Sequence, residues 1–326
     1  MQSLNQPQLV TVFGGSGFVG RHVVRALARR GYRVRVAVRR PDLAGHLQPL
    51  GGVGQIAAVQ ANLRYRASVD AAVAGADHVV NCVGILFESG RNTFDAVQDF
   101  GARAIAEAAR AAGASLTHIS AIGADPEAES NYQRSKGRAE AEIRRILPSA
   151  VILRPSIVFG AEDGFFNKFA EMARLSPFLP LVGGGETKFQ PVYVGDVAEV
   201  VARAVDGALK PGAVYELGGG RVQSFRELME EMLSVVKRKR LLVSLPWGVA
   251  SLIGSVAGLV PFITPPITAD QVKSLRHDNV VSEGAITDGR TLEGLGIRPT
   301  ALEAVLPSYL VQYRPQGQFT GAGNKA

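Results

Sequence analysis

The feature that most constrains this chain is a cluster of glycines between a short apolar run and a helical pattern. The apolar run, Leu9 to Phe13, predicts a buried strand. It leads into Gly14 to Gly20 (GGSGFVG), after which apolar residues recur at the spacing of an amphipathic helix. Gly14 permits a tight turn, Gly17 lets another group approach the backbone, and Gly20 lets the helix pack closely on the strand. A strand, a tight turn and a helix therefore open the fold.

The alternation of strand and helix continues along the first half of the chain. Strands are expected at 33–38, 55–60, 78–83, 116–120 and 151–153, and helices at 68–74, 93–112 and 131–147. Each right-handed crossover places its helix on a face of the sheet, so this order predicts a parallel sheet covered on both faces. The expected fold class is α/β, a Rossmann-type doubly wound parallel sheet with a smaller C-terminal α/β lobe.

The length of 326 residues and the apolar content of 46% allow one large core and a smaller second one. We expect a Rossmann domain over 1–160, completed by 186–210. The texture changes to prolines, glycines and aromatic residues after Gly160, which predicts a substrate or partner lobe over 161–315. The polar tail, 316–326, is expected to be flexible.

The glycine loop in this context predicts a dinucleotide site, because the N-terminus of the following helix offers N–H donors and a positive dipole to a pyrophosphate. The second strand ends in Arg39 and Arg40 rather than in the acidic residue typical of NAD-selective sites. Guanidinium groups bind a 2′-phosphate, so we expect NADP(H) to be preferred and NAD(H) to be possible. The alternative is that both arginines are solvated charges at the end of the strand. The glycine loop and the strand ends assign to the cofactor Gly14, Ser16, Gly17, Phe18, Val19, Gly20, Arg39, Arg40, Asn62, Val83 and Gly84.

Charge and cysteine content exclude several other classes. The single cysteine, Cys82, leaves no disulfide framework and fits a reducing compartment. The polar N-terminus does not resemble a signal peptide, so we expect a soluble, cytoplasmic protein. The net charge of +7 suits a phosphorylated cofactor, an anionic membrane or an acidic partner, but no nucleic-acid module accompanies it. The five histidines are scattered and predict no metal site.

A long uncharged segment, 241–269, follows the basic cluster Lys237 to Arg240. Its length would admit a membrane span, but prolines and glycines divide it into short pieces. A basic cluster beside an apolar helix that carries Trp247 is typical of a membrane interface. We therefore expect peripheral membrane contact through 237–269, a partner-docked helix or a helix buried in the small lobe.

Tyr132 and Lys136, four residues apart downstream of the glycine loop, resemble the Tyr-x-x-x-Lys pair of the short-chain dehydrogenase/reductase superfamily. The segments 153–160 and 190–197 are similar to its extended, epimerase-like branch. The resemblance implies that Tyr132 acts as acid and base and that Lys136 lowers the pKa of its phenol and holds the nicotinamide ribose. It also implies that Ser120, Tyr132, Lys136, Pro155 and Ile157 contact the cofactor.

A narrower resemblance covers most of the chain and is to the nucleotide-binding accessory subunit of respiratory complex I and its bacterial relatives. It is carried by Thr11 to Val24, Tyr132 to Glu140, Arg154 to Phe169, Gln190 to Val197 and Ile267 to Val272. The resemblance implies a structural NADP(H) in a peripheral subunit, in contact with other complex I subunits at the inner face of the membrane.

One departure from the epimerase-like enzymes concerns catalysis. Their catalytic serine would fall near Ile122, and Ser120 is the nearby candidate. Loss of such a donor costs about 3 kcal/mol of transition-state stabilisation. We therefore expect an NADP(H)-binding accessory or assembly subunit. The alternative is an active NADP-dependent reductase or epimerase on a small or lipophilic carbonyl or a sugar nucleotide, with Tyr132, Lys136 and Ser120 as catalytic residues. A redox sensor that uses the same residues also stays open.

Overall fold

A computed structural model of the chain describes residues 7–257 and 268–319. The described residues divide into two compact units, each with its own core. The first unit contains 1–155 and 194–216, and the second contains 156–193 and 217–326. The sequence placed the first boundary at 160 and the returning segment at 186–210. The boundary lies earlier because the strand after Pro155 pairs outside the central sheet.

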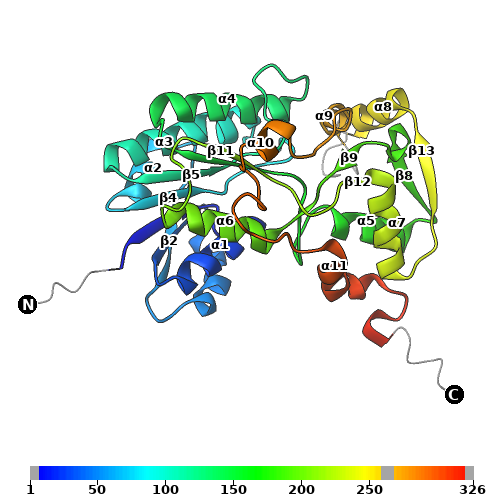
Figure 1. Cartoon of the computed structure of the whole chain (residues 1–326), viewed down its shortest axis with the longest axis horizontal. Helices are drawn as coiled ribbons and strands as arrows, with labels where there is room; N and C mark the ends of the chain where they lie inside the picture. The colour runs from blue at the N-terminus through cyan, green and yellow to red at the C-terminus, as the bar shows by residue number, and fades with distance from the viewer. Residues whose placement is uncertain (1–6, 258–267, 320–326) are drawn as a thin grey trace, which may run out of the picture. The chain divides into compact units, whose positions relative to one another are not determined.

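The first unit is built on a seven-stranded sheet of order β11-β6-β5-β4-β1-β2-β3 (Figure 1). Its strands are β1 (Leu9–Phe13), β2 (Arg33–Val38), β3 (Ile56–Gln60), β4 (His78–Asn81), β5 (Ser115–Ile119), β6 (Val151–Pro155) and β11 (Val214–Leu217). The pairs among β1 to β6 are parallel. The predicted doubly wound parallel sheet is confirmed.

Helices cover both faces of this sheet, as Figure 1 shows. Helices α2 (Arg66–Val73), α3 (Phe100–Ala112) and α4 (Asn131–Ile146) lie on one face, and α1 (Phe18–Arg29) and α6 (Val194–Val205) pack together on the other. Alanines make up much of the core beneath α3, which lets this helix approach the sheet closely. The 3-10 turns η1 (Pro41–Leu43) and η2 (Gly45–Leu50) precede β3.

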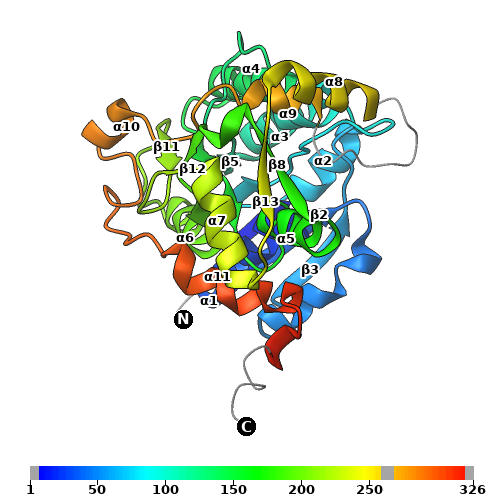
Figure 2. The same ribbon diagram turned by 90° about the vertical axis from the view of Figure 1, so that its right-hand side faces the viewer.

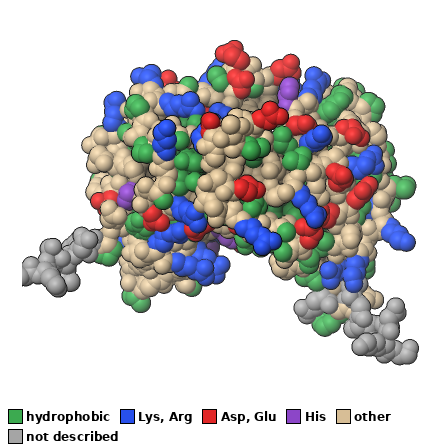
Figure 3. Space-filling view, viewed as in Figure 1, with side chains coloured by type: hydrophobic (Ala, Val, Ile, Leu, Met, Phe, Trp, Pro, Cys, Tyr) green, Lys and Arg blue, Asp and Glu red, His purple; other side chains and the backbone are tan. Residues whose placement is uncertain are grey.

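Several of the clustered arginines have structural roles in the first unit. Arg30 forms ion pairs with Glu199 and Asp206 of the α6 region at 2.8 and 2.9 Å. Arg35 donates to the carbonyls of Ala72 and Ala74 and so caps the end of α2. Basic and acidic side chains are interspersed on the face shown in Figure 3. Some of the clustered arginines therefore stabilise the first unit and are not available to an external partner.

The described part of the second unit holds three two-stranded sheets and a set of helices. Strand β7 (Val158–Phe159) pairs with β10 (Val192–Tyr193), and β9 (Lys188–Phe189) pairs with β12 (Gln223–Ser224). Strand β8 (Phe178–Val182) lies parallel to β13 (Leu241–Leu245), as Figure 2 shows. The helices are α5 (Phe166–Leu175), α7 (Phe225–Val236), α8 (Trp247–Ala257), α9 (Ala269–Ser274), α10 (Glu283–Thr287) and α11 (Leu302–Leu310), with the 3-10 turns η4 (Gly183–Gly185), η5 (Val311–Tyr313) and η6 (Gly317–Phe319).

A buried carboxylate fastens the core of the second unit. Asp163 accepts hydrogen bonds from the backbone N–H groups of Phe165 and Asn167, which begin α5. The same side chain accepts the Tyr309 hydroxyl of α11 at 2.5 Å. Desolvation raises the pKa of Asp163, while these hydrogen bonds oppose the rise. The motif from Arg154 to Phe169 thus contains a structural clasp.

The uncharged segment begins as a strand, β13, and continues as α8. Trp247 and Ala250 of α8 pack with Val182, whereas Leu252 and Ile253 are exposed. Residues 258–267, and with them most of the rest of the segment, lie outside the described residues. Among the described residues, no helix combines the length and the apolar character needed to cross a bilayer.

Candidate functional site

The glycine loop has the backbone geometry that its sequence predicts. Gly14 has φ +74°, and its carbonyl oxygen accepts a hydrogen bond from the N–H of Gly17 at 3.0 Å. A Cβ atom at position 20 would lie 2.2 Å from that oxygen, so no larger residue fits there. Ser16 lies in the loop, and Phe18 and Val19 begin α1.

The beginning of α1 fits an anionic group. Its N-cap, Gly17, has no side chain to cap the first N–H groups, and the first turn has no acidic residue. Both features leave the positive end of the helix dipole uncompensated. The residues present therefore fit the pyrophosphate of a dinucleotide.

The two arginines after β2 are exposed and differ in their contacts. Arg40 binds the Asp42 carboxylate through Nε and Nη2, at 2.9 and 2.6 Å. Arg39 donates instead to Asn92 Oδ1 at 3.2 Å. Asn92 belongs to the loop that follows β4. Of these two arginines, Arg39 is the one without a carboxylate partner among the described residues.

Two further predicted cofactor segments follow β3 and β4. Asn62 Oδ1 accepts hydrogen bonds from the Arg64 backbone N–H and Nε, at 3.2 and 3.4 Å. The N–H of Val83 is held by Asn81 Oδ1 at 3.0 Å. A Cβ atom at Gly84 would lie 3.4 Å from the Lys136 ammonium, so the loop after β4 runs close to α4.

Helix α4 carries the Tyr132 and Lys136 pair. The hydroxyl of Ser130 caps the helix at the Gln133 N–H. Lys136 is buried, and its Nζ donates to the Ile119 carbonyl at the end of β5, at 3.0 Å. Desolvation lowers the pKa of Lys136 to about 8.

The phenol of Tyr132 differs from the prediction. Burial raises the pKa of Tyr132 to about 12, whereas the superfamily resemblance implies a lowered value. Its ring packs against Phe94, with 6.1 Å between the ring centroids. The Lys136 ammonium is directed to the backbone carbonyl of Ile119. Tyr132 is therefore a protonated donor at neutral pH.

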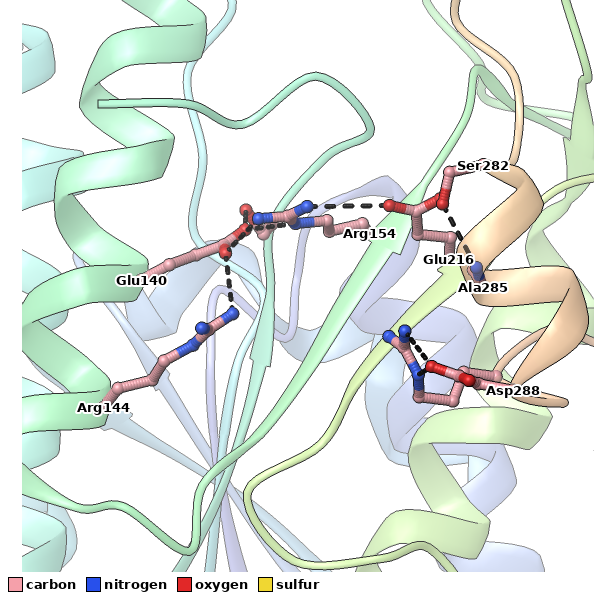
Figure 4. A network of polar contacts seen from close by, with 9 residues as sticks. Glu140, Arg144, Arg154, Glu216, Ser282, Ala285 and Asp288 are labelled. Atoms are coloured by element: carbon pink, nitrogen blue, oxygen red, sulfur yellow. Dashed lines mark hydrogen bonds and ion pairs between the residues drawn. The ribbon is translucent and has the colours of Figure 1, made fainter. Parts of the chain in front are cut away.

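Ser120 is part of a buried polar network around Glu140, whose contacts with Arg144 and Arg154 are drawn in Figure 4. Its hydroxyl donates to Glu140 Oε1 at 2.5 Å, and Arg154 holds both oxygens of the same carboxylate at 2.9 and 2.7 Å. Arg154 also lies 3.6 Å from Glu216 of β11, and Arg144 lies 3.7 Å from Glu140. The Ser120 proton is therefore committed to Glu140. Sequence reasoning missed Glu140 and Arg154, whose only signal was their place in the resembling segments.

Ile122 stands where the superfamily's catalytic serine is expected, and it is buried. Its backbone N–H donates to the carbonyl of Pro155, the last residue of β6, at 3.0 Å. Ile157, the remaining predicted cofactor residue, lies in the second unit and packs against that unit's core. The structure thus places Pro155 in the first unit, beside the end of β5, and Ile157 in the other.

A buried histidine and asparagine form a second polar contact beneath the site that sequence reasoning missed. Asn81 Nδ2 lies 3.0 Å from His118 Nδ1, which accepts its hydrogen. Burial lowers the pKa of His118 well below its ordinary value, with a smaller contribution from the Lys136 charge. His118 is therefore neutral and carries its proton on Nε2.

A single π-helical turn, η3 (Asp95–Asp99), precedes α3 and carries Gln98, which sequence reasoning also missed. The buried Gln98 donates to the Ile85 carbonyl at 2.6 Å and accepts the Ser135 hydroxyl at 2.7 Å. Ser135 lies between Tyr132 and Lys136 on α4. Gln98 therefore joins the loop after β4 to the helix of the tyrosine and lysine, and π-turns of this kind are frequent at functional sites.

The predicted residues of the first unit follow the carboxyl ends of the parallel strands β1 to β5, lie on α1 and α4, or, in the case of Pro155, end β6. That edge is where open α/β sheets bind ligands, and a glycine loop there together with a half-buried Tyr and a buried Lys defines the class of nicotinamide-dinucleotide-binding Rossmann proteins. The chain belongs to the NAD dependent epimerase/dehydratase family, whose model matches residues 10–218. This result confirms the predicted superfamily.

Similarity to individual proteins extends beyond this family assignment. The chain is 34% identical to NADH dehydrogenase (ubiquinone) 1 alpha subcomplex subunit 9 of Arabidopsis thaliana, over 96% of this chain and 80% of that protein. It is 35% identical to a ceramide reductase of Caulobacter vibrioides, over 58% of each chain. A Thermus thermophilus UDP-glucose 4-epimerase in complex with NAD has a similar fold, with a TM-score of 0.66 and 21% identity over 94% of this chain and 99% of that one.

Proposed function

We propose that this protein is an NADP(H)-binding accessory or assembly subunit of a complex I-type respiratory enzyme and that it holds its dinucleotide as a structural cofactor. The near-full-length similarity to subunit 9 of the mitochondrial enzyme supports the complex I role. The uncapped glycine loop and the free charge of Arg39 support the dinucleotide and its phosphate. The nicotinamide of such a cofactor can accept or donate hydride, but the accessory role requires only that it stay bound.

The observation that carries the structural role is the commitment of the Ser120 hydroxyl to Glu140. A carbonyl substrate is polarised by donors directed at its oxygen. The Ser120 proton faces a carboxylate instead, and Ile122 offers no hydroxyl at the catalytic register. The site therefore holds and orients groups better than it stabilises a developing alkoxide.

The proposed subunit also contacts the inner face of the cytoplasmic membrane from its second unit. Exposed Phe178 of β8 and exposed Leu241 of β13 stand opposite each other, and Val243 is exposed on the same strand. Exposed Lys239 precedes this apolar face, and apolar side chains beside cations favour an anionic bilayer surface.

Sedimentation with vesicles tests this contact. The protein should sediment with phosphatidylglycerol-containing vesicles more than with pure phosphatidylcholine. The Lys239→Glu, Leu241→Ser double variant should lose that difference, and Arg25→Glu in the first unit should keep it. If the wild type and both variants sediment equally with the phosphatidylglycerol-containing vesicles, the membrane contact does not lie on this face.

A second candidate function is an active NADP-dependent reductase on a lipophilic carbonyl. Tyr132 and Lys136 are both present on α4, and a pKa of about 8 keeps most of Lys136 protonated at neutral pH. The ceramide reductase similarity covers only part of the chain but favours this substrate class. In this function Tyr132 would donate the proton to the reduced oxygen.

The nucleotide that copurifies with the protein separates the two functions. It should be NADP(H) by mass, and its redox state should not change on incubation with pooled aldehydes, ketones and 3-oxoacyl lipids. Turnover that disappears in Tyr132→Phe would establish the reductase instead. Slow cofactor oxidation that persists in Tyr132→Phe would not count as catalysis by this site.

A further inference from the structure

Two arginines from different strand ends converge on one short loop of the first unit. Arg39, which follows β2, donates to Asn92 Oδ1 at 3.2 Å. Arg64, which follows β3, donates from Nη1 to the carbonyl of Arg91 at 3.5 Å. Their targets are adjacent residues at the base of a tight turn, which the reciprocal backbone hydrogen bonds of Ser89 and Asn92 close. The two guanidinium groups therefore bind adjacent residues of one loop.

The pairing of the strands explains the convergence. Val38 of β2 lies in register with Gln60 of β3, and the Ala61 N–H donates to the Val38 carbonyl at 2.9 Å. Both strands thus end at the same level of the sheet. Arg64 is then oriented by Asn62, whose side-chain oxygen accepts from both its backbone and its Nε.

The electrostatics of this pair point to an anion. In the part of the chain that the structure describes, neither Arg39 nor Arg64 forms an ion pair. The carboxylates nearest to the two arginines along the chain are engaged elsewhere, since Arg40 holds Asp42 and Arg66 binds Asp70 at 2.8 Å. Glu88, close to the loop in sequence, accepts the N–H of Phe94 at 2.7 Å. Two adjacent like charges without a counterion repel each other, and a doubly charged phosphate monoester relieves that repulsion.

We propose that Arg39 and Arg64, and not Arg40, form the subsite for the phosphate monoester on the adenosine ribose of the bound dinucleotide. This inference rests on the proposed NADP(H) cofactor. Arg40 is excluded because its Nε and Nη2 already bind Asp42 in a forked arrangement. Arg64 lies outside the short sequence motif at the end of β2 by which cofactor preference is usually judged, and only the sheet brings it to the site.

The probes that isolate this subsite are 2′,5′-ADP and 5′-AMP, which differ by the 2′-phosphate alone. Their dissociation constants are measured by calorimetry on the nucleotide-free protein and on Arg39→Gln, Arg64→Gln and Arg40→Gln. The wild type should prefer 2′,5′-ADP. Each of Arg39→Gln and Arg64→Gln should reduce that preference by about tenfold to a hundredfold. Arg40→Gln is the matched control and should stay within about twofold of the wild type, since its charge is already paired.

The outcomes separate this inference from the proposed cofactor. A wild type without preference for 2′,5′-ADP would contradict NADP(H) itself. A wild-type preference that survives Arg64→Gln but is lost in Arg40→Gln would overturn the subsite and leave the cofactor standing. Unchanged 5′-AMP affinity shows that each variant is folded. If Arg64→Gln also loses affinity for 5′-AMP, Arg64→Lys decides the question. This variant keeps the charge and should retain part of the preference for 2′,5′-ADP. Retention of the full preference would show that the forked guanidinium is not required.

Discussion

The Ser120 hydroxyl and the Glu140 carboxylate lie 2.5 Å apart in the interior of the first unit, with serine as the donor. Ser120, the serine nearest to the expected catalytic position, therefore helps to hold α4 in place. It also links the end of β5 to Arg154 on β6 through one carboxylate.

Ser120→Ala should therefore lower stability without altering the chemistry of the site. A buried hydrogen bond to a charged acceptor contributes about 2 kcal/mol. The free energy of unfolding, measured by urea denaturation, should fall by that amount, and Ser149→Ala at an exposed position should have little effect. An unchanged unfolding midpoint together with lost turnover would show Ser120 to be catalytic.

Glu140→Gln should destabilise the protein more strongly. It leaves the half-buried Arg154 without its bidentate partner, and removal of one member of a buried pair costs about 3 kcal/mol or more. Glu142→Gln on the same helix breaks an exposed pair with Arg145 and should cost below about 1 kcal/mol. Equal losses in the two variants would contradict the importance of the Glu140 network.

Lys136 predicts a specific pH dependence. Its pKa is about 8 in the folded chain against 10.5 in the unfolded chain, so the folded state binds fewer protons between these values. Stability therefore rises with pH in this window relative to a chain without the group. The free-energy advantage of Lys136→Met over the wild type should shrink by about 3 kcal/mol from pH 8 to 10.5, measured by urea denaturation of both proteins. A constant difference would place the lysine in water.

Gln98 should affect dinucleotide affinity by positioning the loop after β4, without contacting the dinucleotide itself. Gln98→Leu leaves the Ile85 carbonyl and the Ser135 hydroxyl without this partner, so the loop after β4 loses its tether to α4. The dissociation constant of the dinucleotide should rise about tenfold. Ser135→Ala keeps the bond to Ile85 and should have the smaller effect. The reverse order would assign the positioning role to Ser135.

The clasp in the second unit should depend on Tyr309. Tyr309→Phe removes the donor to buried Asp163 and should lower the free energy of unfolding by about 2 kcal/mol. Tyr313→Phe removes a more exposed hydrogen bond to Asn167 Oδ1, at 3.0 Å, and should cost less. Differential scanning calorimetry checks the order, and a larger loss in Tyr313→Phe would argue against the clasp.

Local patterns in the sequence were sufficient for the first unit and for the outline of its site. The period of the apolar residues predicted β1 to β6 and their helices within a few residues, and the glycine loop predicted its own turn. These features depend on neighbours along the chain. The exception was 93–112, where the π-helical turn η3 interrupts the expected helix and aims Gln98 at two distant groups.

What the sequence by itself determined is the fold class, the place of the dinucleotide loop and the Tyr132 and Lys136 spacing, because each follows from periodicity or from the conformational freedom of glycine. The tertiary structure alone decided which polar groups meet. It paired Ser120 with Glu140, Arg40 with Asp42, and β8 with β13, and it brought Arg64 beside Arg39. These partners are far apart along the chain, or other residues of the same type lie near enough to form the same contact. Only the packing of strands and helices therefore decides which pairs form.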